Sequence, residues 1–257
     1  MLKAEELSSN NIYDKLAGSY EMRIDATYTQ FLKYKLLERF TKRSDICLDV
    51  GIGNGIFSIP LSGRVKEIHG VEISPKMLEE CRKNIAKAGS GNIYLYERSA
   101  ADLPFENAFF DTVFSYSTLL LVRRIDVALK EIVRVLKPGA IAVLDITNRC
   151  NLSQRYWNKY YVVRGHWGIH SFGLREVERK FRGLGMEVIE RHATGFLDQW
   201  KYIWGLNWLG RRFLEKLFHS TPRCADLDYK ASQKVSHLAN RWYFVVKKET
   251  AREFPKG

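Results

Sequence analysis

A glycine-rich segment and an acidic residue that follows it are the parts of this sequence best suited to chemistry. The segment spans residues 49–55 and reads Asp-Val-Gly-Ile-Gly-Asn-Gly, directly after an apolar run. Glycines let a backbone turn sharply and approach a ligand closely. Glu72 ends the next apolar run, and its carboxylate can accept two hydrogen bonds from the hydroxyls of a ribose. The pattern predicts a site for a ligand that contains a nucleoside.

Short apolar runs alternate with helix-length amphipathic segments, and these elements must position the site. We expect strands at 46–50, 67–73, 93–97, 112–115, 140–146, 186–189 and 242–246, and helices at 75–88, 125–136 and 173–184. Ser74 and Pro75 begin the first helix and Gly89 closes it, while residues 137–139 (Lys-Pro-Gly) stop the second. This rhythm predicts an α/β fold of the Rossmann-like, doubly wound type, with a mostly parallel seven-stranded sheet.

Composition narrows the class of protein. With 257 residues, of which 46% are hydrophobic, the chain can bury a core without disulfides or metals. Apolar runs stay below the roughly 18 residues of a membrane span, and the first residues do not resemble a secretory signal. We therefore expect a cytoplasmic protein. The cysteines at 47, 81, 150 and 224 lack ligand spacing, so we interpret them as buried small side chains and expect no metal site.

The two parts of the chain differ in charge and aromatic content. Residues 1–147 contain 20 basic and 19 acidic residues, whereas residues 148–257 contain 21 and 10, together with all six tryptophans. A segment of about 45 residues with mixed helical character, which is too long for a plain loop, precedes the last predicted strand. We expect a helical, basic, aromatic-rich cap there. The predicted divisions are an N-terminal helical lid (1–44), a core (45–197), the cap (198–240), and the last strand with a tail (241–257).

Three tryptophans in the cap recur every four residues, at 200, 204 and 208. They share one face if residues 198–218 are helical. One interpretation is that this face packs on the core and roofs a hydrophobic substrate pocket. The other is a peripheral contact with a membrane surface, which would give access to a lipophilic substrate. The sequence leaves both open.

The motifs together resemble those of class I S-adenosylmethionine (SAM) dependent methyltransferases. The glycine spacing is Gly-x-Gly-x-Gly, preceded by Asp49 two residues earlier. Residues 103–105 (Leu-Pro-Phe), 110–113 (Phe-Asp-Thr-Val) and 134–139 (Arg-Val-Leu-Lys-Pro-Gly) resemble the family's next signatures in order. The resemblance covers residues 11–192 and the final strand. It implies the Rossmann-like fold, SAM as cofactor and S-adenosylhomocysteine as product.

The resemblance also implies a set of cofactor-binding residues. The glycine loop would hold the methionyl part, Asp49 would lie near its ammonium, and Glu72 would bind the ribose. The segment that often reads Gly-Asp-Ala is Arg98-Ser99-Ala100 here, so Ser99 replaces the aspartate that contacts adenine in many relatives. The implied cofactor residues are Tyr20, Asp49, Gly51, Gly53, Asn54, Gly55, Glu72, Ile73, Met77, Ser99, Ala100 and Ser115.

Catalysis needs alignment of the acceptor with the methyl group and, for some acceptors, removal of a proton. Tyr116 follows the fourth strand, and His166 and His170 follow the fifth; these three are the candidate catalytic residues. No Asp/Asn-Pro-Pro-aromatic motif follows the fourth strand, which disfavours nucleic-acid amines as acceptors. We expect methyl transfer to an O, N or C atom of a small or lipophilic molecule. If the basic cap contacts this molecule, we expect the molecule to carry an anionic group. An RNA methyltransferase and a catalytically silent SAM-binding protein remain alternatives, and the oligomeric state is open.

Overall fold

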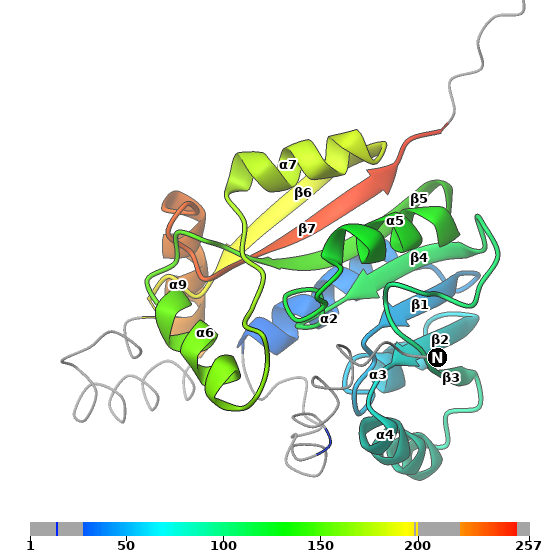
Figure 1. Cartoon of the computed structure of the whole chain (residues 1–257). Helices are drawn as coiled ribbons and strands as arrows, with labels where there is room; N and C mark the ends of the chain where they lie inside the picture. Colours follow the sequence, from blue (N-terminus) through cyan, green and yellow to red (C-terminus); the bar gives the residue numbers. More distant parts are fainter. Residues whose placement is uncertain (1–13, 15–27, 198, 200–221, 251–257) are drawn as a thin grey trace, which may run out of the picture.

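A seven-stranded sheet lies at the centre of the computed structural model, which describes residues 14, 28–197, 199 and 222–250 (Figure 1). The strand order is β3-β2-β1-β4-β5-β7-β6. Neighbouring strands are parallel except around β7, which pairs antiparallel with β5 and β6. The predicted α/β, mostly parallel, doubly wound sheet is therefore confirmed. The elements in chain order are α2 (Tyr28–Phe40), β1 (Ile46–Val50), α3 (Ser58–Ser62), β2 (Glu67–Glu72), α4 (Pro75–Ala88), β3 (Ile93–Glu97), β4 (Phe110–Ser115), α5 (Ile125–Val135), β5 (Leu136–Thr147), α6 (Gln154–Val163), α7 (Leu174–Gly183), β6 (Met186–Thr194), α9 (Pro222–Lys234) and β7 (Arg241–Lys248).

Helices cover both faces of the sheet because successive strand residues point to opposite sides. In β5, Leu144 and Ile146 belong to a core cluster shared with α5 and α7, whereas Val143 belongs to a second cluster shared with α2 and α3. Figure 1 shows α5 and α7 on one side of the sheet and α2 on the other. Both faces are thus buried, which is why the parallel strands read as nearly continuous apolar runs.

The signals at the ends of α4 act as the sequence predicts. Ser74 is extended, and its Oγ accepts a hydrogen bond of 3.2 Å from the backbone N–H of Met77. Pro75 occupies the first helical position, and Gly89 ends the helix at φ +67°. The helix therefore begins immediately after β2, beside the carboxyl ends of the strands.

Two boundaries and one helix differ from the predictions. The helix expected to end at Leu136 ends at Val135, and residues 137–139, expected to stop it, instead belong to β5, because Leu136 is already extended. The strand expected at 186–189 continues to Thr194, because β6 pairs with β7 along its whole length. Helix α6 was not predicted, and none of its side chains is fully buried.

Cysteine burial was predicted correctly in part. Cys47 and Cys81 are buried, but Cys150 is exposed in the turn after β5, so its interpretation as a buried side chain was wrong. Its neighbours Asn148 and Asn151 are the buried residues of this turn. Within the part of the chain that the structure describes, no helix is long and apolar enough to cross a bilayer.

Candidate active site

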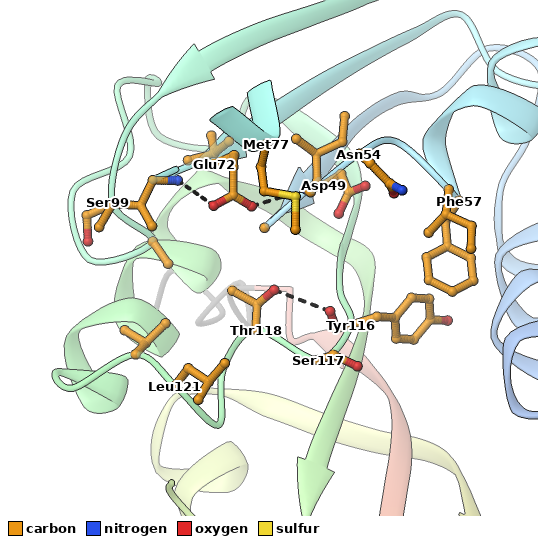
Figure 2. A pocket seen from close by; sticks show the side chains of 18 of the residues that line it. Asp49, Asn54, Phe57, Glu72, Met77, Ser99, Tyr116, Ser117, Thr118 and Leu121 are labelled. Carbon is orange, nitrogen blue, oxygen red and sulfur yellow. Dashed lines mark hydrogen bonds between the residues drawn. The ribbon is translucent and has the colours of Figure 1, made fainter. Parts of the chain in front are cut away.

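A cavity of about 460 Å³ opens at the carboxyl-terminal edge of β1, β2 and β4 (Figure 2). One half, here called the cofactor half, is formed by the ends of β1 and β2 and by the loop after β3. The other, the acceptor half, is formed by α2, α6, the loop after β4 and the start of β7. Figure 2 shows Asp49, Glu72 and Met77 facing Tyr116, Ser117 and Thr118 across the space. The cofactor half is lined by Asp49, Gly51, Ile52, Gly53, Asn54, Ile56, Phe57, Val71, Glu72, Ile73, Met77, Arg98, Ser99 and Ala100.

The turn after β1 requires glycine at its first position. Gly51 has φ +84°, and a Cβ added there would overlap the side chain of Thr118. Its N–H donates a 2.7 Å hydrogen bond to the carbonyl oxygen of Val71 on β2. Gly53 also has a positive φ, +56°, but a Cβ there would meet no atom within 4 Å. The loop is therefore packed tightly against Thr118 at Gly51 and is open at Gly53.

Gly51→Ala is expected to destabilise the fold by about 1–3 kcal/mol, because the new methyl group overlaps Thr118 and a non-glycine residue is strained at this φ. Gly53→Ala introduces the conformational strain alone and should lower the free energy of unfolding by about 1–2 kcal/mol. Urea denaturation of the two variants measures the difference. A double variant, Gly51→Ala with Thr118→Ala, should recover the part due to overlap. Equal stability of the two single variants would contradict the role assigned to Thr118.

Glu72 ends β2 with both carboxylate oxygens turned toward backbone N–H groups. Oε1 accepts from Ile73 and Ser74 at 2.8 and 3.0 Å, and Oε2 accepts from Gly53 at 3.1 Å. Burial raises its pKa, while these backbone hydrogen bonds oppose the shift. A carboxylate offers about four acceptor positions, so Oε2 keeps room for one further donor from the cavity. Glu72 thus ties the glycine loop to the start of α4.

Asp49 is a second buried carboxylate in the cofactor half. Its Oδ2 accepts a 2.6 Å hydrogen bond from Ser58 Oγ, and the residue is only 4% exposed. Burial raises its pKa to about 7; the charge of Glu72 adds to this shift and the Ser58 hydroxyl opposes it. The site therefore favours a cation beside Asp49, because a positive charge would stabilise the ionised form.

The remaining predicted cofactor residues divide between lining and support. Asn54, Ile73, Met77, Ser99 and Ala100 line the cavity. Ser99 Oγ accepts a 3.2 Å hydrogen bond from the N–H of Ala101. The structure does not place Gly55 or Ser115 in the lining.

These two residues support the site from behind. The N–H of Gly55 donates to the carbonyl oxygen of Ile52 at 3.0 Å, which closes the turn. Ser115 Oγ donates to the carbonyl oxygen of Val50 at 2.8 Å, which fastens β4 to β1. Tyr20 lies outside the described residues, as do Trp200, Trp204 and Trp208.

Tyr116 lines the acceptor half, but its hydroxyl is occupied. It donates a 2.9 Å hydrogen bond to the carbonyl oxygen of Lys33 on α2, and burial raises its pKa well above the usual value. Ser117 follows with φ +59°, and its N–H donates to Asp145 Oδ2 at 2.9 Å. The ring of Tyr116 therefore shapes the wall, while its hydroxyl holds α2 against the end of β4.

The two candidate histidines lie outside the cavity lining. The Nδ1 atom of His166 is 2.5 Å from the carbonyl oxygen of Gly168, and the ring is buried. The Nε2 atom of His170 is 3.2 Å from the carbonyl oxygen of Arg123, and its backbone N–H donates to Leu120. Burial lowers the pKa of His166. The structure therefore uses both side chains to brace the loops beside the acceptor half and does not bring them to the cavity.

Residues that were not predicted complete the acceptor half. Lys33 and Gln30 come from α2, Arg241 begins β7, and Trp157, Tyr160 and Tyr161 come from α6. Lys33 had a recognisable signal: it lies three and four residues before the buried Leu36 and Leu37, on the apolar face of the helix. The position of Arg241 at the cavity could not be predicted before β7 was known to be antiparallel. In that direction, the first residue of β7 lies at the carboxyl ends of β4 and β5.

The cofactor half fits SAM. Its two buried carboxylates suit a ligand that carries an ammonium and a sulfonium, and they would repel the pyrophosphate of a dinucleotide. Glu72 Oε2 retains capacity for a hydroxyl donor, and Gly53 leaves open space where a ligand can approach the backbone. Ile73, Met77 and Ala100 supply apolar surface beside the N-terminus of α4. These carboxylates and apolar surfaces together suit a nucleoside that carries a positive charge.

Comparison with known proteins agrees with this geometry. Residues 48–144 match the family model described as a methyltransferase domain. A 2-phytyl-1,4-naphthoquinone methyltransferase of Trichormus variabilis is 33% identical over 162 residues, covering 59% of this chain and 70% of that protein. The chain belongs to the class I SAM-dependent methyltransferases.

Two further similarities extend over more of the methyltransferase chain. A demethylmenaquinone methyltransferase of Geobacillus kaustophilus is 28% identical over 217 residues, covering 77% of this chain and 92% of that protein. The crystal structure of the [4+2]-cyclase SpnF superimposes with a TM-score of 0.66 at 16% identity, covering 95% of this chain and 96% of that one. At this identity the second similarity supports the fold alone.

Proposed function

We propose that this methyltransferase transfers the methyl group of SAM to a small lipophilic molecule bound in the acceptor half of the cavity. The observation that carries the proposal is the wall of the acceptor half, where Trp157, Tyr160 and Tyr161 of α6 line the cavity together with Leu121 and Val122. Large apolar and aromatic surfaces with few polar groups are typical of pockets for lipophilic ligands. Relatives named for naphthoquinone and menaquinone substrates support this substrate class.

The cofactor residues are part of the same proposal. Asp49 would meet the ammonium of SAM, Glu72 its ribose, and the surfaces of Ile73, Met77 and Ala100 its adenine, with Ser99 beside them. The sulfonium supplies an activated methyl group with a neutral leaving group. The protein must therefore align the acceptor and exclude water, and such alignment supplies about 7–11 kcal/mol in favourable cases.

Of the expected lid at residues 1–44, α2 forms part of the acceptor half, and the segment that contains Asp14 would cover the cofactor half. Asp14 supports this assignment, because its Oδ1 accepts a 2.6 Å hydrogen bond from Ser74 Oγ at the N-terminus of α4. Ile73 and Met77, on either side of that contact, line the cavity. The cap at 198–240 would close the acceptor half; its described part, α9, is fastened to the end of β6 through Asp228, which accepts from the N–H of Gly195 at 2.9 Å.

The test is a methyl-transfer assay with isotopically labelled SAM and three classes of acceptor. Reduced naphthoquinones with short isoprenoid tails and a sterol represent lipophilic acceptors, and bulk tRNA represents the RNA alternative. Label should enter the lipophilic fraction. Label in tRNA alone would overturn the proposed substrate class, and SAM binding without transfer to any acceptor would favour a silent binding protein.

Trp157→Ala is expected to raise the KM for the lipophilic acceptor, at a cost of about 1–2 kcal/mol in acceptor binding, because an aromatic wall of the acceptor half is lost. SAM affinity should stay unchanged, since Trp157 does not line the cofactor half. Val163→Ala is the matched control, because Val163 lies on the same helix, is 72% exposed and does not line the cavity. Steady-state kinetics and calorimetry with SAM separate the two effects. A variant that loses SAM affinity and acceptor affinity together would contradict the division of the cavity into halves.

A further inference from the structure

Two cations share one carboxylate beside the acceptor half. Lys33 Nζ lies 3.7 Å from Asp145 Oδ2, and Arg241 Nη1 lies 2.8 Å from the same oxygen. The N–H of Ser117 donates to this oxygen as well, and Lys33 Nζ donates to Ser117 Oγ at 3.1 Å. Lys33, Ser117 and Arg241 all line the cavity. The cluster therefore places two fixed cations at the wall that an acceptor would touch.

The charges of this cluster do not balance. Asp145 on β5 is 1% exposed and provides a single negative charge, which Arg241 approaches more closely than Lys33 does. The Lys33 side chain is 9% exposed. Uncompensated charge in so buried a place is costly unless a ligand or partner supplies the counter-charge. One net positive charge thus faces the cavity from the side opposite the carboxylates of the cofactor half.

Aromatic rings take the place of water around the Lys33 ammonium. Its Nζ atom lies 5.7 Å from the ring centre of Phe57, 5.1 Å from that of Tyr116 and 5.6 Å from that of Tyr243. Such rings stabilise the cation weakly and do not themselves supply oxygen or nitrogen acceptors for its N–H groups. Of the three N–H donors of the ammonium, Ser117 Oγ accepts one at 3.1 Å and Asp145 lies at the longer distance of 3.7 Å. A ligand oxygen in the cavity would be a stronger partner than either.

The environment also changes the proton affinity of this amine. Burial lowers the pKa of Lys33 to about 8, with Arg241 on β7 adding to the shift and Asp145 on β5 opposing it. About one molecule in ten then carries the neutral amine at pH 7. The hydroxyls of Tyr116 and Tyr243, the nearest other titratable groups, have raised pKa values and stay protonated. Lys33 is therefore the group of this cluster that can exchange a proton near neutral pH.

We infer that Lys33 accepts a proton from an acidic hydroxyl of the acceptor, a phenol or an enol, and then holds the resulting oxyanion together with Arg241. The inference rests on the proposed function and names its acceptor chemistry. The O–H bond breaks, its electron pair stays on oxygen, and the proton adds to the lone pair of Nζ. The oxygen, or a carbon conjugated with it, then attacks the methyl carbon while the electrons of the S–CH3 bond pass to sulfur. When a ring carbon is the attacking atom, that carbon loses its proton afterwards.

Other side chains are less suited to this role. The hydroxyl of Tyr116 already donates to the carbonyl oxygen of Lys33. His166 and His170 do not line the cavity, and their rings lie against the backbone carbonyls of Gly168 and Arg123. Arg241 stays protonated, since Asp145 raises its pKa, so it can only assist as a fixed donor. Asp145 is a positioning residue: it orients Arg241 and the N–H of Ser117 and does not line the cavity.

The test uses 4-nitrophenol, whose ionised form absorbs visible light, bound to the full-length protein saturated with S-adenosylhomocysteine. The wild type should bind the phenolate at least about tenfold more tightly than the un-ionised phenol, because a charge-assisted hydrogen bond forms with the anion only. Lys33→Met should lower the affinity for phenolate about tenfold. Lys33→Arg should restore it within about threefold, because arginine keeps the charge, yet should fail to restore turnover of an un-ionised acceptor, because arginine has no lone pair to offer.

The matched control is Lys35→Met, because Lys35 lies on the same helix but is exposed and paired with Glu38. It should behave as the wild type. Binding of S-adenosylhomocysteine, measured by calorimetry in the same samples, shows whether a negative result overturns the proposed function or only the role of Lys33. If the product does not bind, the proposed function falls. If the product binds but the wild type does not prefer phenolate, or Lys33→Met keeps the preference, the role of Lys33 is overturned and the proposed function stands.

Discussion

Replacing Glu72 by alanine is expected to weaken SAM binding by about 1.5–3 kcal/mol, which corresponds to roughly 10–150-fold in affinity. Two losses combine. A donor from the ribose loses its buried acceptor, and the N–H groups of Gly53, Ile73 and Ser74 lose theirs. The glycine loop would then no longer be fastened to the N-terminus of α4. Calorimetry with SAM and with S-adenosylhomocysteine measures the effect.

Glu97→Ala is the matched control for this variant. Glu97 ends β3 directly opposite Glu72 in the strand register, but it is exposed and does not line the cavity. Its replacement should leave cofactor affinity within about twofold, the scale of an exposed charge. NAD should bind neither the wild type nor Glu97→Ala, because Asp49 and Glu72 repel its pyrophosphate. Equal SAM affinity in Glu72→Ala and wild type would overturn the assignment of Glu72 to the cofactor.

The sequence predicts the cofactor half well because local rules govern it. A strand, a glycine turn and a helix must follow one another within a few residues, and the types at Gly51, Glu72 and Ser74 reflect backbone conformation and capping. Parallel strands then place their carboxyl ends at one edge. The positions of Asp49 and Glu72 in the cavity follow from these short-range constraints alone.

The acceptor half could not be predicted in the same way because it joins elements distant in the chain. Lys33 meets Asp145 and Arg241 across 112 and 208 residues of sequence, and only the strand order with an antiparallel β7 brings them together. Helix α6 has no fully buried side chain, so its aromatic residues face the cavity without marking it as a core helix. The histidines after the fifth strand were expected at the cavity by their place in the sequence, but helix α6 intervenes, and in the loop after it His166 and His170 lie against backbone carbonyls instead.

The second large effect is expected in the pH dependence of cofactor binding. The free protein holds Asp49 with a pKa of about 7, raised mainly by burial. The ammonium of SAM would favour the ionised carboxylate, so binding below pH 7 must release a proton from Asp49. Affinity should therefore fall by up to about tenfold, or 1.4 kcal/mol, for each pH unit below 7, and it should level off above about pH 8.

The stability of the ligand-free protein should change in the opposite direction. Between the ordinary pKa of an aspartate and about 7, the native state keeps Asp49 protonated while the unfolded chain has lost that proton. The native state thus binds more protons, and the contribution of Asp49 to the free energy of unfolding falls as pH rises through this window. Urea denaturation of wild type and Asp49→Asn at matched pH values isolates that contribution.

Asp49→Asn decides whether Asp49 causes both effects. It removes the titrating group but retains a side chain of the same size beside Ser58, so SAM should bind weakly at every pH, with a flat profile between pH 5.5 and 8. Asp126→Asn changes an exposed carboxylate on α5 and should keep the wild-type profile. A wild-type affinity that does not change over this range, or a pH profile that survives in Asp49→Asn, would show that the ammonium of SAM is held elsewhere in the cavity.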